Sequence, residues 1–66
     1  MDLAQFILEA DQYWHANMSQ RKGQAYFNYL DSVRPDIAGE IRGTEADPFY
    51  VATNLPAFCE KVAELL

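Results

Sequence analysis

The chain has 66 residues, of which 50% are apolar and 14% aromatic, enough to build one small hydrophobic core with little to spare. Ten acidic side chains against five basic ones give a formal net charge of -5, which argues against direct, non-specific binding to nucleic acid and makes a basic surface the natural counterpart. Because small cores are often supported by self-association, a homodimer is one expectation.

The single cysteine, Cys59, excludes an internal disulfide and a cysteine-based zinc site. The opening residues MDLAQFILEADQ lack a basic segment and a small-residue cleavage site, and no apolar run reaches the length needed to cross a bilayer. These features predict a cytoplasmic protein without an export signal or a membrane anchor.

A first helix is predicted near the start of the chain. Asp2 can cap it, and Gln5 follows three residues later, as in a capping box. The apolar positions recur at helical spacing and share one face; they are Leu3, Phe6, Ile7, Ala10, Tyr13 and Trp14. The opposite face is polar, and Leu8 is left among its side chains.

The second helix is expected to begin at Ser19, a good N-cap, and to run to about Val33. Its inner face is rich in aromatic side chains, and its members are Tyr26, Phe27, Tyr29, Leu30 and Val33. Gly23 falls at the edge of this face, where the missing side chain predicts the close approach of another helix.

A short third helix is predicted from Pro35 to Arg42, because proline suits the first position of a helix and Gly43 suits its end. This helix would bury Ile37 and Ile41.

The stretch RGTEADPFYVAT is expected to be a loop in which Thr44 and Asp47 bond to nearby backbone groups and Phe49 enters the core. A last helix follows it, capped by Asn54 or Thr53. The apolar face of this helix contains Leu55, Phe58, Cys59, Val62, Leu65 and Leu66. Together, the segments predict an all-α fold, a small bundle of three long helices plus one short helix with one ordered loop, as a single domain over residues 1–66.

The sequence carries no recognisable catalytic signature: it has no glycine-rich phosphate loop, His-Glu-x-x-His pair, calcium loop or nucleophile elbow. We therefore predict no enzyme activity, no cofactor and no metal site. Cys59 and His15 fall on an apolar and a polar helix face respectively, which favours a structural thiol over a catalytic pair. His15 follows Asp11 by four residues, so an exposed ion pair is expected, with proton transfer as the alternative.

Acidic residues gather in the middle of the chain. Asp36 and Glu40 lie one helical turn apart, where like charges repel, and a solvated face is the simplest explanation. The alternative is an acidic strip that mimics the phosphates of a nucleic acid and binds a basic groove. This strip would run through Asp31, Asp36, Glu40, Glu45 and Asp47. Arg34 and Arg42 interrupt it.

Arg21 and Lys22 are adjacent basic residues at the expected start of the second helix, where positive charge opposes the helix macrodipole. They either pair with acidic neighbours elsewhere in the bundle or contact a partner. Arg21, Gln24 and Asn28 share one polar stripe of this helix. The stripe either recognises a partner or fixes the loop, with Arg21 reaching Asp47 and the two amides bonding loop backbone.

The strings RKGQAYFNYL, RPDIA, IRGTEADPFY and LPAF together resemble a group of short uncharacterised proteins of bacteria and their phages. In that group an R-x-G-Q-A-x-F-N segment precedes an R-G-T-x-x-D-P-F segment. The similarity covers residues 17 to 58 and implies no particular activity, although it suggests a phage or prophage setting. Its polar residues define a candidate interaction surface of Arg21, Gln24, Asn28, Arg42, Thr44 and Asp47.

The sequence therefore predicts a small acidic protein-interaction module without catalytic activity. Its partner is expected to be another protein or a second copy of the chain, with no direct binding to nucleic acid or membrane. The alternative is an acidic inhibitor that occupies the nucleic-acid site of a host protein.

Overall fold

The computed structural model describes residues 1–49 and 54–66, and within them it contains helices and no β-strand. The helices are α1 (Leu3–Ala16), α2 (Lys22–Val33), α3 (Pro35–Ile41) and α4 (Leu55–Leu65). The all-α class is confirmed. The helices have 14, 12, 7 and 11 residues, so the contrast between three long helices and a short one is weaker than predicted.

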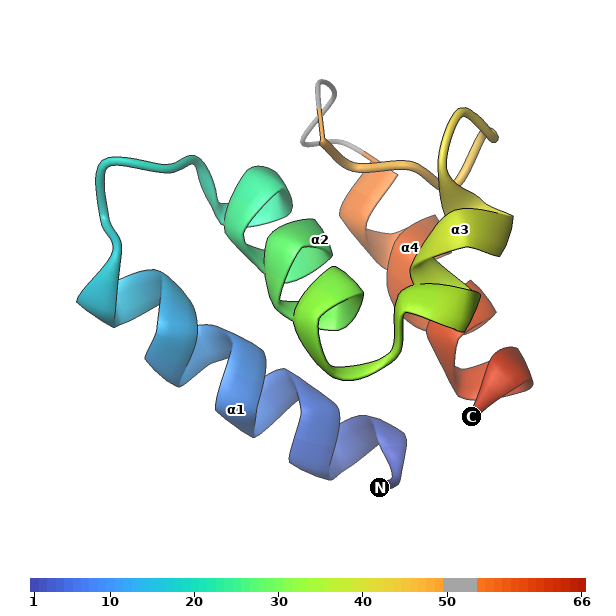
Figure 1. Ribbon diagram of the computed structural model, residues 1–66, viewed down its shortest axis with the longest axis horizontal. Helices are drawn as coiled ribbons and strands as arrows, with labels where there is room; N and C mark the ends of the chain where they lie inside the picture. The colour runs from blue at the N-terminus through green and yellow to red at the C-terminus, as the bar shows by residue number, and fades with distance from the viewer. Residues whose placement is uncertain (50–53) are drawn as a thin grey trace.

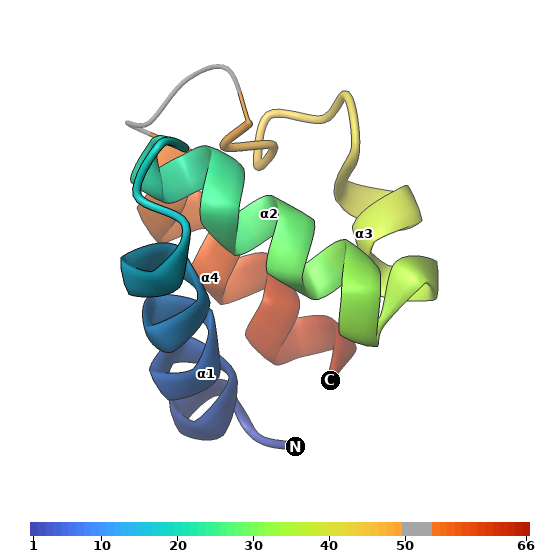
Figure 2. The same cartoon turned by 60° about the vertical axis from the view of Figure 1, so that its left-hand side comes forward.

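The helices form a bundle in which α2 is central (Figure 1). α2 contacts α1 on one side and α3 on the other, and α4 packs against α3 and α1. Figure 2 shows α2 crossing in front of α4, with the two chain ends at the same end of the bundle. All four helices therefore contribute to a shared core.

Aromatic rings occupy the centre of this core. The Phe6 ring of α1 lies 6.4 Å from the Tyr26 ring of α2 and 6.1 Å from the Phe58 ring of α4. Phe27 reaches the same Phe58 ring at 6.4 Å between centroids. The other buried hydrophobic residues are Ala10, Ala25, Leu30, Ile37, Ala38, Ile41 and Val62.

The start of α1 agrees with the prediction in part. The backbone N–H of Gln5 donates to Asp2 Oδ1 at 2.8 Å, so Asp2 is the N-cap. The Gln5 side chain, however, donates to the Glu9 carboxylate instead of turning back toward Asp2 as a capping box requires. Leu8 is 55% exposed, as expected for an apolar residue on the polar face.

The predicted start of α2 at Ser19 is wrong. The helix begins at Lys22, and Arg21 occupies the N-cap position without a side-chain cap. Trp14 explains the shift, because its indole Nε1–H donates to the Gln20 carbonyl at 3.1 Å. That bond holds the connection in a turn, so helical backbone starts only after Arg21.

The glycine of α2 marks a close contact, but with a loop and not with another helix. Gly23 is buried. A Cβ atom built on it would collide with the carbonyl oxygen of Pro48 and lie 3.2 Å from Pro48 Cβ. The loop after α3 therefore packs directly on the first turn of α2, and it does so because residue 23 has no side chain.

α3 ends at Ile41, one residue earlier than predicted, and Ile37 and Ile41 are buried as expected. Gly43 follows with φ +77°, the left-handed conformation that glycine adopts without strain. Thr44 Oγ1 donates to the Ile41 carbonyl at 2.6 Å and accepts from Ala46 N–H. The predicted local bonding of Thr44 in the loop is therefore confirmed.

The second half of the loop reaches the core at its edge. The Phe49 ring is half-buried and meets the Phe27 ring edge-on, 5.9 Å between centroids. At the start of α4, Asn54 occupies the N-cap position without a capping bond, because its Nδ2 donates to the Asp47 carbonyl at 2.9 Å. The alternative cap, Thr53, lies outside the described residues.

Candidate functional site

A shallow depression of about 220 Å³ lies where α2, the residue after α3 and the loop meet. We call it the loop hollow, and its lining residues are Phe27, Asn28, Arg42, Asp47 and Phe49. Asn28, Arg42 and Asp47 belong to the surface predicted from the sequence. Residues from three separate segments are therefore brought together at one place.

Arg42 forms the charged side of the loop hollow. Its guanidinium carbon lies 5.3 Å from the centroid of the Phe27 ring, a cation–π geometry. One guanidinium nitrogen is 3.6 Å from Asp31 Oδ1, and both side chains of this ion pair are largely exposed. The aromatic ring holds the planar guanidinium in place while leaving its outer N–H groups toward solvent.

Asp47 shapes the hollow from inside the loop. Its two carboxylate oxygens accept from the backbone N–H groups of Gly43, at 2.8 Å, and of Phe49, at 2.9 Å. Both oxygens are thus engaged in closing the loop, as predicted for this residue. Arg21 does not pair with it: Arg21 Nη2 donates instead to the Phe49 carbonyl at 3.5 Å. The predicted contact of Arg21 with the loop is present, with a different acceptor.

The remaining residues of the predicted surface are spread apart. Asn28 Nδ2 donates to Gln20 Oε1 at 3.2 Å and not to the loop backbone, contrary to one of the two explanations offered for the stripe. Gln24 is half-buried and makes no side-chain hydrogen bond with the described parts of the chain. Thr44 lines a different depression, together with Glu40, Glu45, Ala46 and Lys61.

Lys22 does not pair with an acidic residue of the described chain, contrary to one of the two explanations offered for the basic pair. Its ammonium nitrogen lies 5.7 Å from the centroid of the Trp14 ring and 5.5 Å from that of Tyr26. Residues 22 and 26 are one helical turn apart. A lysine four residues before a tyrosine was therefore a signal in the sequence that periodicity analysis missed.

The predicted acidic strip is divided by arginines. Asp31 pairs with Arg42, and Asp36 accepts two bonds from Arg34, at 2.9 and 3.1 Å. These bonds from Arg34 lower the pKa of Asp36 below its ordinary value. Asp47 bonds to the loop backbone. The two remaining members, Glu40 and Glu45, are exposed and make no ion pair with any residue of 1–49 or 54–66.

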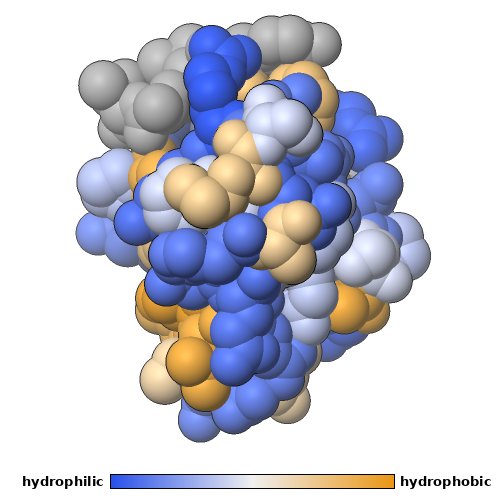
Figure 3. All heavy atoms as spheres, turned by 90° about the vertical axis from the view of Figure 1, so that its left-hand side faces the viewer, coloured by the Kyte–Doolittle hydropathy of each residue, from blue (hydrophilic) through white to orange (hydrophobic). Residues whose placement is uncertain are grey.

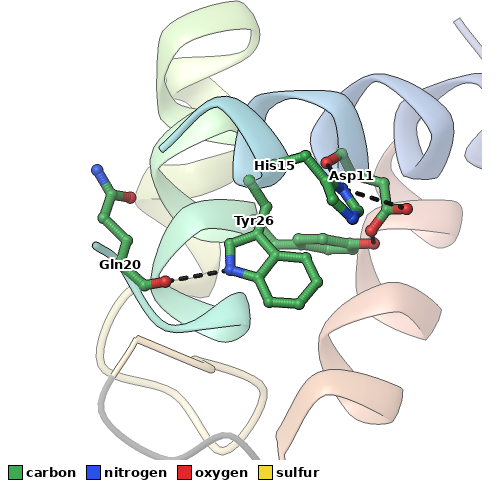
Figure 4. Close-up of polar contacts among 5 residues, drawn as sticks. Asp11, His15, Gln20 and Tyr26 are labelled. Atoms are coloured by element: carbon green, nitrogen blue, oxygen red, sulfur yellow. Dashed lines mark hydrogen bonds and ion pairs between the residues drawn. The ribbon is translucent and has the colours of Figure 1, made fainter. Parts of the chain in front are cut away.

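A polar contact between α1 and α2 was not foreseen (Figure 4). Tyr26 OH donates to Asp11 Oδ1 at 3.0 Å. Burial, and secondly this bond, raises the pKa of Tyr26 to about 12. His15 Nδ1 lies 2.7 Å from the Asp11 carbonyl oxygen and 4.0 Å from Asp11 Oδ2. Asp11 and His15 lie side by side as predicted. The Asp11 carboxylate also joins α1 to α2, because it accepts the hydrogen bond from Tyr26 OH.

The surface of α1 carries only scattered apolar side chains. Figure 3 shows small hydrophobic areas separated by hydrophilic ones on the face that α1 dominates. The large exposed hydrophobic residues on or next to this helix are Met1, Leu8 and Met18. Single exposed apolar residues of this kind are normal for a protein surface.

Two features are absent from the described residues. No three histidine, cysteine, aspartate or glutamate side chains within 1–49 and 54–66 come together as a metal site. No helix in the same residues is long and apolar enough to span a bilayer. Comparison of the chain with protein-family models, curated proteins and solved structures found no match.

Proposed function

We propose that the protein is a non-catalytic interaction module that binds another protein at the loop hollow. The observation that carries the proposal is the placement of Arg42 over Phe27, beside the half-buried ring of Phe49. Arginine and aromatic side chains are enriched at protein interfaces and among the residues that dominate binding energy. A partner would place an apolar side chain against the rings and a carboxylate or carbonyl oxygen on the guanidinium.

The polar groups of the loop hollow favour a protein partner over a small ligand. They are largely occupied, because Asp47 closes the loop and Asn28 Nδ2 bonds to Gln20. What remains accessible is the outer side of Arg42 and the aromatic surface, which suit one anchoring side chain of a partner.

The setting of this interaction is part of the proposal. The resemblance noted above supports a bacterial or phage protein, and the single cysteine supports a reducing cytoplasm as its location. A second copy of the chain is the other candidate partner. Light scattering at low and high salt separates the two: a monomer at both salt concentrations points to a different protein, whereas a dimer that persists at high salt points to self-association.

The experiment compares Arg42→Ala with Arg34→Ala. Both arginines are exposed and paired with an aspartate, but Arg34 lies outside the loop hollow. The wild type and the two variants are immobilised separately. Proteins that each of them captures from a bacterial lysate are identified by mass spectrometry. We expect one protein to be retained by the wild type and Arg34→Ala and lost by Arg42→Ala. Equal retention by all three would refute the assignment of this surface.

An acidic inhibitor that imitates nucleic acid is the second candidate. The carboxylates of Glu40 and Glu45 favour it, because they are exposed and make no ion pair within the described residues. The pairing of Asp31 and Asp36 with arginines weakens it. Such an inhibitor would lose affinity steeply as salt rises. Replacing Asp31, Asp36, Glu40 and Glu45 by their amides would release its partner, so a partner retained by that variant rejects this alternative.

A further inference from the structure

A second depression, largely apolar, lies between α1, α2 and α4 and has a volume of about 290 Å³. We call it the Lys22 pocket, and its lining residues are Ile7, Lys22, Tyr26, Leu55, Pro56 and Cys59. All but Lys22 present carbon, sulfur or an aromatic ring. The pocket therefore has an apolar wall with one ammonium group at its edge.

The ammonium of Lys22 stands out among the basic groups of the chain. Arg34, Arg42 and Lys61 each pair with a carboxylate, and Arg21 bonds to a backbone carbonyl. Lys22 has no carboxylate partner in residues 1–49 and 54–66, although the chain has ten acidic residues. The centroids of the Trp14 and Tyr26 rings lie 5.7 and 5.5 Å from its nitrogen.

The other polar group of the pocket is the Tyr26 hydroxyl, and it already has a hydrogen-bond partner. Tyr26 OH donates to Asp11, so this hydroxyl is directed to α1 and not to a ligand. Cys59 is half-buried, and burial raises the pKa of its thiol, which keeps the thiol in its neutral form. The Lys22 ammonium would therefore favour a ligand with a negative charge, and the remaining lining residues would favour an apolar group next to that charge.

We infer that the Lys22 pocket binds a small amphipathic carboxylic acid, such as a medium-chain fatty acid. The carboxylate would pair with the Lys22 ammonium, and the alkyl chain would cover Ile7, Leu55 and Pro56. The space is sufficient, since a cavity of about 150 Å³ already holds benzene. A neutral alcohol of the same length would keep the apolar contacts and lose the ion pair.

The test is a titration of the protein with octanoate and, separately, with 1-octanol. Trp14 is the single tryptophan of the chain and lies beside the Lys22 ammonium, so its fluorescence reports binding. Protection of Cys59 from iodoacetamide, measured in each variant with and without ligand, shows that the ligand occupies the pocket. Lys22→Met is the test variant. Lys61→Met is its matched control, because Lys61 is on α4 outside this pocket.

We expect octanoate to bind the wild type and Lys61→Met with equal affinity, and Lys22→Met about five- to tenfold more weakly. Binding of 1-octanol should be the same in all three proteins. Circular dichroism confirms that each variant is folded. The inference is wrong if octanoate leaves Cys59 unprotected at millimolar concentration, or if Lys22→Met binds octanoate as well as the wild type does.

Discussion

The contact between the loop and α2 makes opposite predictions for two glycines. Gly23 is in the first turn of α2, and an added Cβ would collide with the Pro48 carbonyl oxygen. Gly39 is in the middle of α3, and beyond its chain neighbours and its own helix backbone an added Cβ would meet no atom of the described residues within 4 Å. Replacing glycine with alanine therefore creates a steric clash in α2, whereas in α3 the added methyl group has open space.

The magnitudes follow from these surroundings. Alanine in place of an exposed helical glycine stabilises by about 0.5–1 kcal/mol, which is the expectation for Gly39→Ala. Overfilling a packed site costs about 1–3 kcal/mol. Pro48 is fully buried and its neighbour Asp47 bonds to the loop backbone, so the carbonyl has little freedom to move away. We expect Gly23→Ala to lose about 1–2 kcal/mol after the gain in helix propensity is subtracted.

Urea unfolding followed by circular dichroism measures both free energies of unfolding. Heating gives a second readout, because 1 kcal/mol shifts the melting temperature of a domain of this size by about 4–8 °C. Gly39→Ala should melt above the wild type and Gly23→Ala below it. A Gly23→Ala protein as stable as Gly39→Ala would refute the packing of the loop on α2 and, with it, the geometry of the loop hollow.

Three further outcomes are expected. Gly43→Ala should lose about 1 kcal/mol in urea unfolding because φ is +77° at this position, and an unchanged midpoint would contradict the left-handed turn. Burial raises the pKa of Tyr26 to about 12, so between pH 10 and 12 the folded state keeps the phenol proton while the unfolded state loses it. The free energy of unfolding should therefore fall by about 2 kcal/mol across that range. Tyr26→Phe should lack this part of the decline, and an equal decline in the variant and the wild type would argue against the raised pKa. Burial raises the pKa of Cys59, and the charge of Lys22 lowers it by a smaller amount. Lys22→Met should therefore move the pH profile of Cys59 alkylation to higher pH. A shift to lower pH would be inconsistent with the structure.

Local features of the fold were predictable because they depend on neighbours in sequence. The cap at Asp2 and the turn at Gly43 follow from side-chain and backbone preferences of a few adjacent residues. The start of α2 was not predictable in this way. The indole N–H of Trp14 donates to the backbone carbonyl of Gln20, six residues later in the chain. This bond holds residue 20 in a turn, so the helix begins after Ser19.

The candidate site was predictable only in part, for the same reason. Helical spacing placed Arg21 and Asn28 on one stripe, but the packing of Arg42 on Phe27 joins residues 15 positions apart in different elements. Gly23 indicated a close contact without naming Pro48 as its partner. Contacts of this kind depend on how the elements pack, which periodicity within a helix does not specify.

The most direct test of the proposed function is the dissociation constant of the captured partner for Arg42→Ala and Arg34→Ala, measured beside their free energies of unfolding. Arg42 makes one exposed ion pair and one cation–π contact, so its loss should cost no more than about 1–2 kcal/mol of stability. We predict binding at least about 30-fold weaker for Arg42→Ala, as for a residue that dominates an interface, and unchanged for Arg34→Ala. Equal dissociation constants for the two variants would contradict a recognition surface at the loop hollow and leave Arg42 with a role in the fold alone.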